Sequence, residues 1–340
     1  MARIDGTLGI DHLMRGVGAR TVVEGKDVAH HAVVTSDEEG RGQRELRFVW
    51  LEITGKCQLY CRHCYAASGP SGTHGSMEAG DWLRVLDQAA ELGASAVQFI
   101  GGEPTLHPGL PILVGRALRH QMEVEVFSNL VRVPEALWKM IEQPGVSLAT
   151  SYYSSDAKEH NRITARRSHD RTLANIREAK RRGIPLRVGV IDMHEQQRMD
   201  LTVEELRELG IAQIGVDYLR QVGRGASQST PSVDQLCGRC ADASLAISPS
   251  GEVWPCVFSR WLLLGNVHRS GLAEINQAAL NVRTQLRMVF QARGSLPLNG
   301  CDPDCRPCEP NCSPKFECNP KKSDGDPHGC PPKKDCHPWE

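Results

Sequence analysis

Three cysteines lie close together in the sequence and have the types and spacing to hold a metal cluster. Cys57, Cys61 and Cys64 form the pattern C-x3-C-x2-C directly after an apolar run at 46–53. Cysteine thiolates are the usual ligands of iron–sulfur clusters. A four-iron cluster on three thiolates keeps one iron open, and an open metal position is typical of a site that does chemistry.

A zinc site is the alternative interpretation of this loop. Structural zinc takes four ligands, so a fourth group would be needed beside the three thiols. His63 and His74 are near in the sequence, but neither has the spacing that zinc fingers use. The spacing favours an iron–sulfur cluster and leaves zinc open.

A second motif follows the next apolar run, residues 96–100, as Gly101-Gly102-Glu103-Pro104. Glycines allow a backbone to approach a ligand closely, and the Glu103 carboxylate can accept a hydrogen bond from an ammonium group. Taken alone, Gly-Gly also suits an ordinary turn. Together with the cysteine loop before it, the motif resembles that of the radical S-adenosylmethionine (SAM) enzymes, and the resemblance covers roughly residues 46–225.

The resemblance implies a [4Fe-4S] cluster on Cys57, Cys61 and Cys64, with SAM chelating the open iron. It implies that one-electron reduction cleaves SAM to methionine and a 5′-deoxyadenosyl radical, which abstracts a hydrogen atom from the substrate. An electron donor such as flavodoxin or ferredoxin would supply the electron. The cofactor carries this chemistry, and the protein supplies placement and shielding.

By the same resemblance, residues that follow successive strands are expected to contact SAM. The expected set is Gly101, Gly102, Glu103, Pro104, Ser128, Asn129, Ser151 and Arg162. Ser128 and Asn129 also fit a turn at the end of a strand. Arg162 is chosen because arginine binds carboxylates in a bidentate manner, and Arg166 and Arg167 compete with it for that role.

The elements that must position these residues alternate between strand-like and helix-like patterns. Strands are expected at 46–53, 96–100, 122–127, 146–151, 186–191 and 213–218, and helices near 78–92, 110–120, 134–143, 171–182 and 202–209. Ser76 is the expected N-cap of the first helix and Gly93 its stop. Such alternation predicts an α/β fold with a parallel sheet and outer helices. This matches the partial (β/α)6 TIM-type barrel of the resembled family, whose active site lies at the carboxyl ends of the strands.

The C-terminal part of the chain is rich in cysteine. Cys237-x2-Cys240, an expected hairpin at 245–254 and Cys256 closely resemble the start of the SPASM/twitch auxiliary-cluster domains, and a helix near 272–292 would follow. A zinc ribbon, which also uses C-x2-C on a hairpin, is the alternative. The resemblance implies one or two auxiliary [4Fe-4S] clusters. Their expected ligands are Cys237, Cys240, Cys256, Cys301, Cys305, Cys308, Cys312 and Cys318.

The order of the later cysteines departs from the family's usual pattern, and Cys330 and Cys336 have no assigned role. The expected division is an N-terminal extension at 1–45, a radical SAM core at 46–225 and an auxiliary iron–sulfur domain at 226–340. The extension is interpreted as a flap over the barrel, with two short strands at 20–24 and 32–35.

The net charge, the N-terminal sequence and the cysteine content limit the classes of function that the sequence supports. A net charge of −1 gives no indication of electrostatic binding to nucleic acid or to a membrane. The N-terminus lacks the apolar core of a signal peptide, so a cytoplasmic location is expected. Thirteen cysteines in such a protein indicate metal ligands rather than disulfides.

The expected function is that of a SPASM-type radical SAM enzyme similar to peptide maturases. It would cross-link or oxidise a ribosomally synthesised precursor peptide. The alternative is dehydrogenation or epimerisation of a small molecule such as an aminoglycoside or nucleoside. The additional, C-terminal set of cysteines favours a peptide substrate. The lack of a recognisable peptide-docking module favours a small-molecule substrate. A zinc-ribbon binding protein is the non-enzymatic alternative.

Overall fold

The computed structural model describes residues 46–193, 197–226 and 231–292. The expected N-terminal extension, with its two strands at 20–24 and 32–35, lies outside the described residues. So do the cysteines from Cys301 to Cys336.

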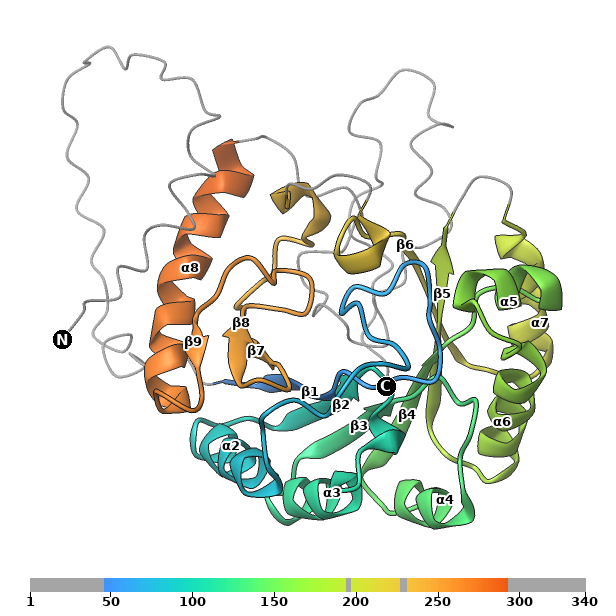
Figure 1. Ribbon diagram of the computed structural model, residues 1–340, viewed down its shortest axis with the longest axis horizontal. Coiled ribbons are helices and arrows are strands. Elements are labelled where there is room, and N and C mark those ends of the chain that lie inside the picture. The colour runs from blue at the N-terminus through green and yellow to red at the C-terminus, as the bar shows by residue number, and fades with distance from the viewer. Residues whose placement is uncertain (1–45, 194–196, 227–230, 293–340) are drawn as a thin grey trace, which may run out of the picture.

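Six parallel strands form the predicted partial barrel. They are β1 (Phe48–Thr54), β2 (Ala96–Gly101), β3 (Glu123–Phe127), β4 (Val146–Ser151), β5 (Leu186–Asp192) and β6 (Gln213–Tyr218). Each pairs in parallel with the next in chain order. Parallel neighbours need a crossover connection, and helices supply most of these crossovers. Figure 1 shows helices along the outer side of the curved sheet, with the loop that follows β1 on its inner side.

The helices of the barrel are α2 (Ala79–Glu91), α3 (Leu110–Arg119), α4 (Glu135–Ile141), α5 (Ala157–Thr164), α6 (His169–Arg181) and α7 (Met199–Glu208). Short 3-10 turns occur at η1 (Pro104–Leu106), η2 (Gly223–Gly225) and η3 (Val233–Gln235). The sequence did not indicate α5, because that segment is polar and offers little apolar periodicity. Its start is capped by the Asp156 carboxylate, which accepts from the Glu159 amide, and it ends at Ala165 with a positive φ.

The predicted N-cap of α2 is wrong by two residues. Glu78 holds that position, and its amide donates to the Asp81 carboxylate at 2.9 Å. The Ser76 amide instead donates to the carbonyl of Pro249, in the turn after β7. Gly93 follows the helix end with φ of 90°, the left-handed conformation expected of a glycine stop.

The segment after the barrel extends the same sheet. β7 (Ser244–Ile247) pairs in parallel with β1, and β8 (Glu252–Trp254) and β9 (Gly265–Asn266) follow in antiparallel order. The predicted hairpin is therefore confirmed, but its attachment to β1 was not foreseen. The predicted helix is α8 (Leu272–Ala292). Among the helices of the described residues, none combines the length and apolar character needed to cross a bilayer.

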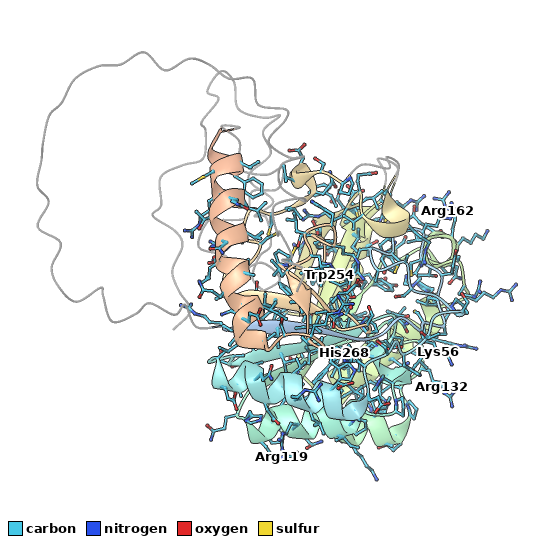
Figure 2. All side chains as sticks on the ribbon, turned by 60° about the vertical axis from the view of Figure 1, so that its left-hand side comes forward. Lys56, Arg119, Arg132, Arg162, Trp254 and His268 are labelled. Carbon is cyan, nitrogen blue, oxygen red and sulfur yellow. The ribbon has the colours of Figure 1, made fainter. Side chains whose placement is uncertain are left out.

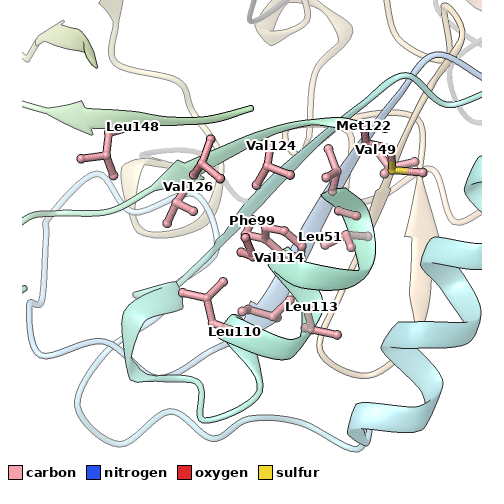
Figure 3. Close-up of a cluster of buried hydrophobic side chains, with 14 of the residues drawn as sticks. Val49, Leu51, Phe99, Leu110, Leu113, Val114, Met122, Val124, Val126 and Leu148 are labelled. Carbon is pink, nitrogen blue, oxygen red and sulfur yellow. The ribbon is translucent and has the colours of Figure 1, made fainter. Parts of the chain in front are cut away.

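Alternation along the strands gives the sheet two buried faces. Outward side chains of β1–β3, such as Leu51, Phe99 and Val124, pack beneath Leu113 and Val114 of α3 (Figure 3). Inward side chains of β1 and β2 form a second cluster with the auxiliary segment. Its members include Trp50, Ile100, Leu236, Cys240 and Cys256. The auxiliary segment thus covers part of the barrel interior.

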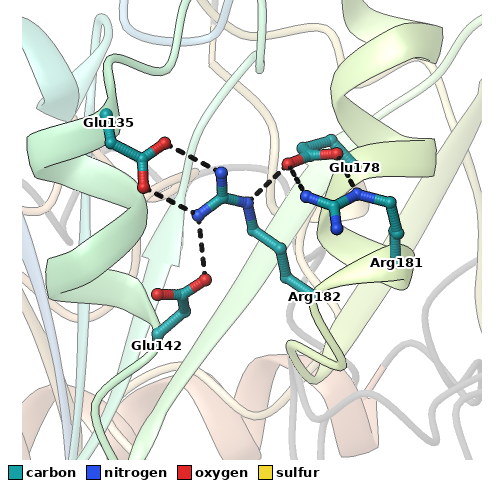
Figure 4. A network of polar contacts seen from close by, with 5 residues as sticks. All are labelled: Glu135, Glu142, Glu178, Arg181 and Arg182. Carbon is teal, nitrogen blue, oxygen red and sulfur yellow. Dashed lines mark hydrogen bonds and ion pairs between the residues drawn. The ribbon is translucent and has the colours of Figure 1, made fainter.

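Arg182, after the end of α6, fastens that helix to α4. Its guanidinium bonds Glu135 at 2.8 Å, Glu142 at 2.9 Å and Glu178 at 2.6 Å (Figure 4). It also lies over the Trp138 ring at 5.1 Å. Several carboxylates sharing one arginine form a network, which stabilises more than an isolated surface pair.

Candidate iron–sulfur cluster site

The loop after β1 brings three thiols together at the carboxyl end of the sheet. Cys57 is buried, while Cys61 and Cys64 are half-buried. Burial first, and then the nearby Cys64 and Cys57 thiols, raise the pKa of the Cys61 thiol to about 12. Thiolates that lie close together in a desolvated environment need a compensating positive charge nearby. A metal ion supplies that charge, and a thiol that coordinates it is deprotonated. The donor set therefore fits a cluster.

In the described part of the chain, no three His, Cys, Asp or Glu side chains converge on a point that could hold a single metal ion. A four-iron cluster does not require such a point, because its irons are ligated by separate thiolates. The cysteine loop suits that mode of binding.

The end of α5 supports the loop from one side. The Tyr60 amide donates to the carbonyl of Thr164 at 3.1 Å, and the Arg62 amide donates to that of Ile163 at 3.0 Å. These are among the last carbonyls of a helix, which have no partner within the helix itself. The loop and α5 thus satisfy each other's backbone groups.

Arg224, in η2, supports the loop from the other side. Its guanidinium donates to the carbonyls of Cys61 at 2.9 Å and Ser68 at 2.6 Å, and lies 4.1 Å from the Tyr60 ring centroid. Its amide donates to the carbonyl of Cys64 at 3.0 Å. Arg224 was not predicted as a site residue from the sequence, where its position between Gly223 and Gly225 was the available signal.

Asn129, at the end of β3, contacts the first cysteine. Its Nδ2 donates to the Cys57 sulfur at 3.6 Å, and its Oδ1 accepts from Gln58 Nε2 at 3.0 Å. The Leu59 amide also donates to the Cys57 sulfur, at 3.4 Å. The structure thus places Asn129 against Cys57, an expected cluster ligand, while its expected contact with SAM stays a prediction.

Glu103 and Ser128, both expected to contact SAM, are buried and bonded to each other. Ser128 Oγ donates to Glu103 Oε1 at 2.8 Å, and the Asn129 amide donates to Oε2 at 2.8 Å. Thr105 donates to Oε1 from its amide and its hydroxyl. Burial raises the pKa of Glu103. The carboxylate therefore joins the ends of β2 and β3, and its role toward the SAM ammonium stays a prediction.

Gly101 and Gly102 lie against the chain's own backbone. A Cβ at Gly101, where φ is 130°, would come within 2.3 Å of the Thr54 carbonyl oxygen. One at Gly102 would come within 2.3 Å of the Lys56 carbonyl oxygen. Glycine is required here because β2 ends against the entry to the cysteine loop. Pro104, which is buried, begins η1 directly afterwards.

Ser151, the last residue of β4, lies near the cluster loop through Tyr153. The buried Tyr153 hydroxyl lies close to the Ser151 side chain and to the Cys61 thiol, and burial followed by that thiol raises its pKa. The Tyr153 ring also meets His63 edge-on, with centroids 4.8 Å apart. Tyr153 was not predicted as a site residue from the sequence, although it stands two residues after Ser151.

Arg162 has a different environment from the other expected residues. Its side chain is 56% exposed and lies 3.9 Å from Glu159 on the same helix. Arg166 and Arg167, its competitors, are also exposed. The expected contact of one of these arginines with the SAM carboxylate stays a prediction.

The auxiliary segment holds a second group of cysteines. The sulfurs of Cys240 and Cys256 are 3.2 Å apart and buried, and Cys237 is half-buried. The hydrogen bond with Cys240 lowers the pKa of the Cys256 thiol to about 7. The further expected ligands Cys301, Cys305, Cys308, Cys312 and Cys318 lie outside the described residues.

Aromatic residues link the two groups of cysteines. Tyr65, directly after Cys64, meets Phe258, two residues after Cys256, with ring centroids 5.4 Å apart. Beside them, Arg260 binds the buried Glu52 of β1 at 2.7 and 2.9 Å. This ion pair joins the barrel to the auxiliary segment. No sequence motif indicated it.

Family models match both halves of the chain. The radical SAM superfamily model matches residues 51–209, and the SPASM model, an iron–sulfur cluster-binding domain, matches residues 226–312. The chain is therefore a radical SAM protein with a SPASM domain. Its cofactors are accordingly SAM, a [4Fe-4S] cluster in the barrel and auxiliary iron–sulfur clusters in the SPASM domain.

Curated relatives in this group include proteins named PqqA peptide cyclase. The one from Granulibacter bethesdensis is 27% identical over 191 residues, covering 54% of this chain and 51% of the relative. That from Xanthomonas campestris pv. campestris is 28% identical over 210 residues, covering 60% and 56%. The chain thus spans about half the length of the curated relatives it matches.

Solved structures of similar fold include Streptococcus suis SuiB bound to its precursor peptide SuiA. The TM-score is 0.62 at 12% identity, covering 82% of this chain and 78% of SuiB. The AdoMet-bound enzyme anSMEcpe gives a TM-score of 0.52 at 13% identity, covering 67% and 77%. These likenesses establish the fold.

Proposed function

We propose that this protein cleaves SAM reductively and uses the radical to abstract a hydrogen atom from a ribosomally synthesised precursor peptide, which it cross-links or oxidises. The observation that carries the proposal is the gathering of three thiols at the carboxyl end of β1, inside the segment that matches the radical SAM model. The name PqqA peptide cyclase, shared by the relatives, supports a peptide substrate.

Cys57, Cys61 and Cys64 would hold the SAM-binding cluster. Bound there, the cluster and SAM supply the one-electron chemistry that generates a radical able to abstract hydrogen. The residues around the loop have positioning roles. Asn129 and the Leu59 amide orient the Cys57 sulfur, and Arg224 fixes the backbone at Cys61 and Cys64.

SAM would lie on the inner side of the strand ends. The residues proposed to contact it are Gly101, Gly102, Glu103, Pro104, Ser128, Asn129, Ser151 and Arg162. The auxiliary segment packs on the inner face of β1 and β2, around Trp50 and Ile100. Such packing excludes water, which protects a reactive species from side reactions.

The auxiliary clusters would be held by Cys237, Cys240 and Cys256 together with the later cysteines. The extension, core and auxiliary domain are proposed at 1–45, 46–225 and 226–340. We also propose that an external protein supplies the electron and that the enzyme acts in the cytoplasm.

The first test separates the catalytic cluster from the auxiliary ones. The chain is reconstituted anaerobically, and iron, sulfide and 5′-deoxyadenosine formed from SAM with dithionite are measured. At four irons per cubane, the iron content should fall by about four in the Cys57→Ala/Cys61→Ala/Cys64→Ala variant. A fall from about twelve to about eight means two auxiliary clusters, and a fall from about eight to about four means one. SAM cleavage should be lost; if cleavage persists in that variant, the assignment of the loop is wrong.

The second test concerns the substrate. Short peptides encoded beside the gene are incubated with the reduced enzyme and SAM, and their masses are compared before and after reaction. A cross-link removes two hydrogen atoms, so a matching loss of mass with the site located by fragmentation supports the proposal. Turnover of an aminoglycoside or nucleoside, with no change in any peptide, would contradict it.

A further inference from the structure

Two arginines and an aspartate lie beside the buried cysteines of the auxiliary segment. We propose that Arg239, Asp242 and Arg283 form a charged group that raises the reduction potential of the auxiliary cluster held by Cys240 and Cys256. Two arginines and one aspartate leave one positive charge in excess next to the proposed ligands. The inference rests on the proposed function, because these cysteines must ligate an iron–sulfur cluster, but it does not depend on the substrate.

Arg283 is a charged residue on a buried and otherwise apolar face of α8. Leu286 and Val289, about one and two turns further along this helix, pack with Cys240 and Cys256. The Arg283 side chain is 7% exposed, and its Nη1 donates to the carbonyl of Cys240 at 3.3 Å. Burying a charge costs free energy, so packing alone does not explain an arginine at this position.

Asp242 joins the two arginines. Its Oδ1 lies 2.9 Å from Arg283 Nη2, and its Oδ2 lies 3.6 Å from Arg239 Nε. The residues on either side, Ala241 and Ala243, have positive φ of 59° and 55°. This left-handed conformation is uncommon for residues other than glycine. Such backbone conformations persist where surrounding contacts maintain them, and they are frequent at functional sites.

Arg239 carries a buried nitrogen that points to a missing acceptor. It lies within the C-x2-C pair itself, between Cys237 and Cys240. Among the described residues, its buried Nη1 has no hydrogen-bond partner. Buried polar groups are normally paired, so this nitrogen indicates an acceptor beside the cysteines. The sulfurs of an iron–sulfur cluster accept hydrogen bonds, so the arginine fits a cluster at this position.

An excess of positive charge acts on a cluster in one direction. Reduction adds a negative charge, which a nearby cation stabilises, so the reduction potential rises. Arginine remains protonated in proteins, so this charge does not depend on pH. Charges act more strongly where water is excluded. Here α8 lies along the auxiliary segment beside β8, which ends at Trp254 (Figures 1 and 2). A cluster of raised potential is more easily reduced, which is the property that an electron acceptor needs.

The same contacts would also suit a purely structural clamp between α8 and the cysteine loop. The two roles differ in the sign of their effects. Replacing Arg283 removes a positive charge, whereas neutralising Asp242 removes a negative one. Both changes weaken a clamp, but they move a potential that is set by charge in opposite directions.

The test measures reduction potentials in the full chain after anaerobic reconstitution. The protein is poised at a series of potentials, and the reduced clusters are followed by electron paramagnetic resonance. The signal that disappears in Cys240→Ala/Cys256→Ala belongs to the cluster at this site. The variants are Arg283→Met, Arg283→Lys and Asp242→Asn. Arg287→Met is the matched control, because Arg287 is exposed on the same helix.

We expect the potential to fall in Arg283→Met and to rise in Asp242→Asn. The equilibrium constant for reduction should change about tenfold in each case, which corresponds to about 60 mV for one electron. Arg283→Lys keeps the charge and should stay near the parental potential, as should Arg287→Met. If Arg283→Met fails to fold, Arg239→Gln removes the same charge and should lower the potential in the same way.

Parental potentials in both Arg283→Met and Asp242→Asn, or shifts of the same sign in both, would overturn the inference and leave these residues as a clamp. If every signal of the parent persists in Cys240→Ala/Cys256→Ala, ligation by these cysteines is wrong, and the inference is wrong with it. Failure of the parent to form 5′-deoxyadenosine from SAM would count against the proposed function alone, because the potentials are measured without substrate.

Discussion

The side-chain amide nitrogen of Asn129 lies 3.6 Å from the Cys57 sulfur, although the two residues are 72 positions apart in the sequence. The same side chain accepts from Gln58 and from the Val131 amide, so its orientation is fixed on both sides. Hydrogen bonds to the sulfurs of an iron–sulfur cluster are among the factors that set its reduction potential.

We therefore predict that Asn129→Leu makes the cluster harder to reduce. A donor to the thiolate stabilises the more negative, reduced state, so its loss should lower the potential. A shift of about 60 mV corresponds to a tenfold change in the equilibrium for one electron. The measurement is a redox titration followed by electron paramagnetic resonance. Ser128→Ala is the control, because Ser128 donates to Glu103 instead. An unchanged potential in Asn129→Leu contradicts the prediction.

The sequence allowed the fold to be predicted but not this contact. Apolar alternation and helical stripes are local, so strands such as 96–100 could be placed to within a residue or two. Motifs predicted that Cys57 and Asn129 lie near a cofactor. A motif does not specify which side chain another one bonds, because that depends on how distant strand ends meet. Arg224, Tyr153 and the Glu52–Arg260 pair were missed for the same reason.

A second prediction concerns the glycine at which β2 ends. A Cβ at Gly102 would lie 2.3 Å from the Lys56 carbonyl oxygen, so Gly102→Ala must displace the backbone that enters the cysteine loop. We expect fewer irons per chain after reconstitution and a lower midpoint of thermal unfolding. Gly80→Ala is the matched control, since no atom lies within 4 Å of a Cβ there.

Gly80 lies in the first turn of α2, where alanine favours the helix by up to about 1 kcal/mol. The control should therefore keep its iron and unfold at the same or a higher temperature. Equal iron content in the two variants would show that the loop tolerates the displacement.

A third prediction tests the link between the barrel and the auxiliary segment. Arg260→Met would leave the Glu52 carboxylate, which is 1% exposed, without its cation. Removing one partner of a buried ion pair costs about 3–5 kcal/mol, whereas replacing both costs much less. We expect a large loss in the free energy of unfolding for Arg260→Met and a smaller one for Glu52→Gln/Arg260→Met, measured by denaturant titration.

The destabilisation caused by Arg260→Met should increase as the pH rises. Burial raises the pKa of Glu52, and loss of Arg260 removes the attraction that opposes this shift. A carboxyl whose folded pKa lies above its unfolded value of about 4.3 loses stability as pH rises. The free energy of unfolding of Arg260→Met should therefore differ more from that of the parent at neutral pH than at mildly acidic pH. Arg84→Met, at an exposed pair with Asp81, is the control and should change stability by less than about 1 kcal/mol.

A fourth prediction concerns the buried sulfurs of Cys240 and Cys256, 3.2 Å apart beneath the inner face of the barrel. If they ligate an auxiliary cluster, Cys240→Ala/Cys256→Ala should lose about four irons per chain, the content of one cubane. The three thiols after β1 are untouched, so formation of 5′-deoxyadenosine with dithionite should remain while modification of the peptide stops. Iron content equal to the parent's would mean that other cysteines hold every auxiliary cluster. Loss of SAM cleavage as well would mean that the auxiliary segment is needed to keep the barrel site folded, as the shared β1–β7 pairing allows.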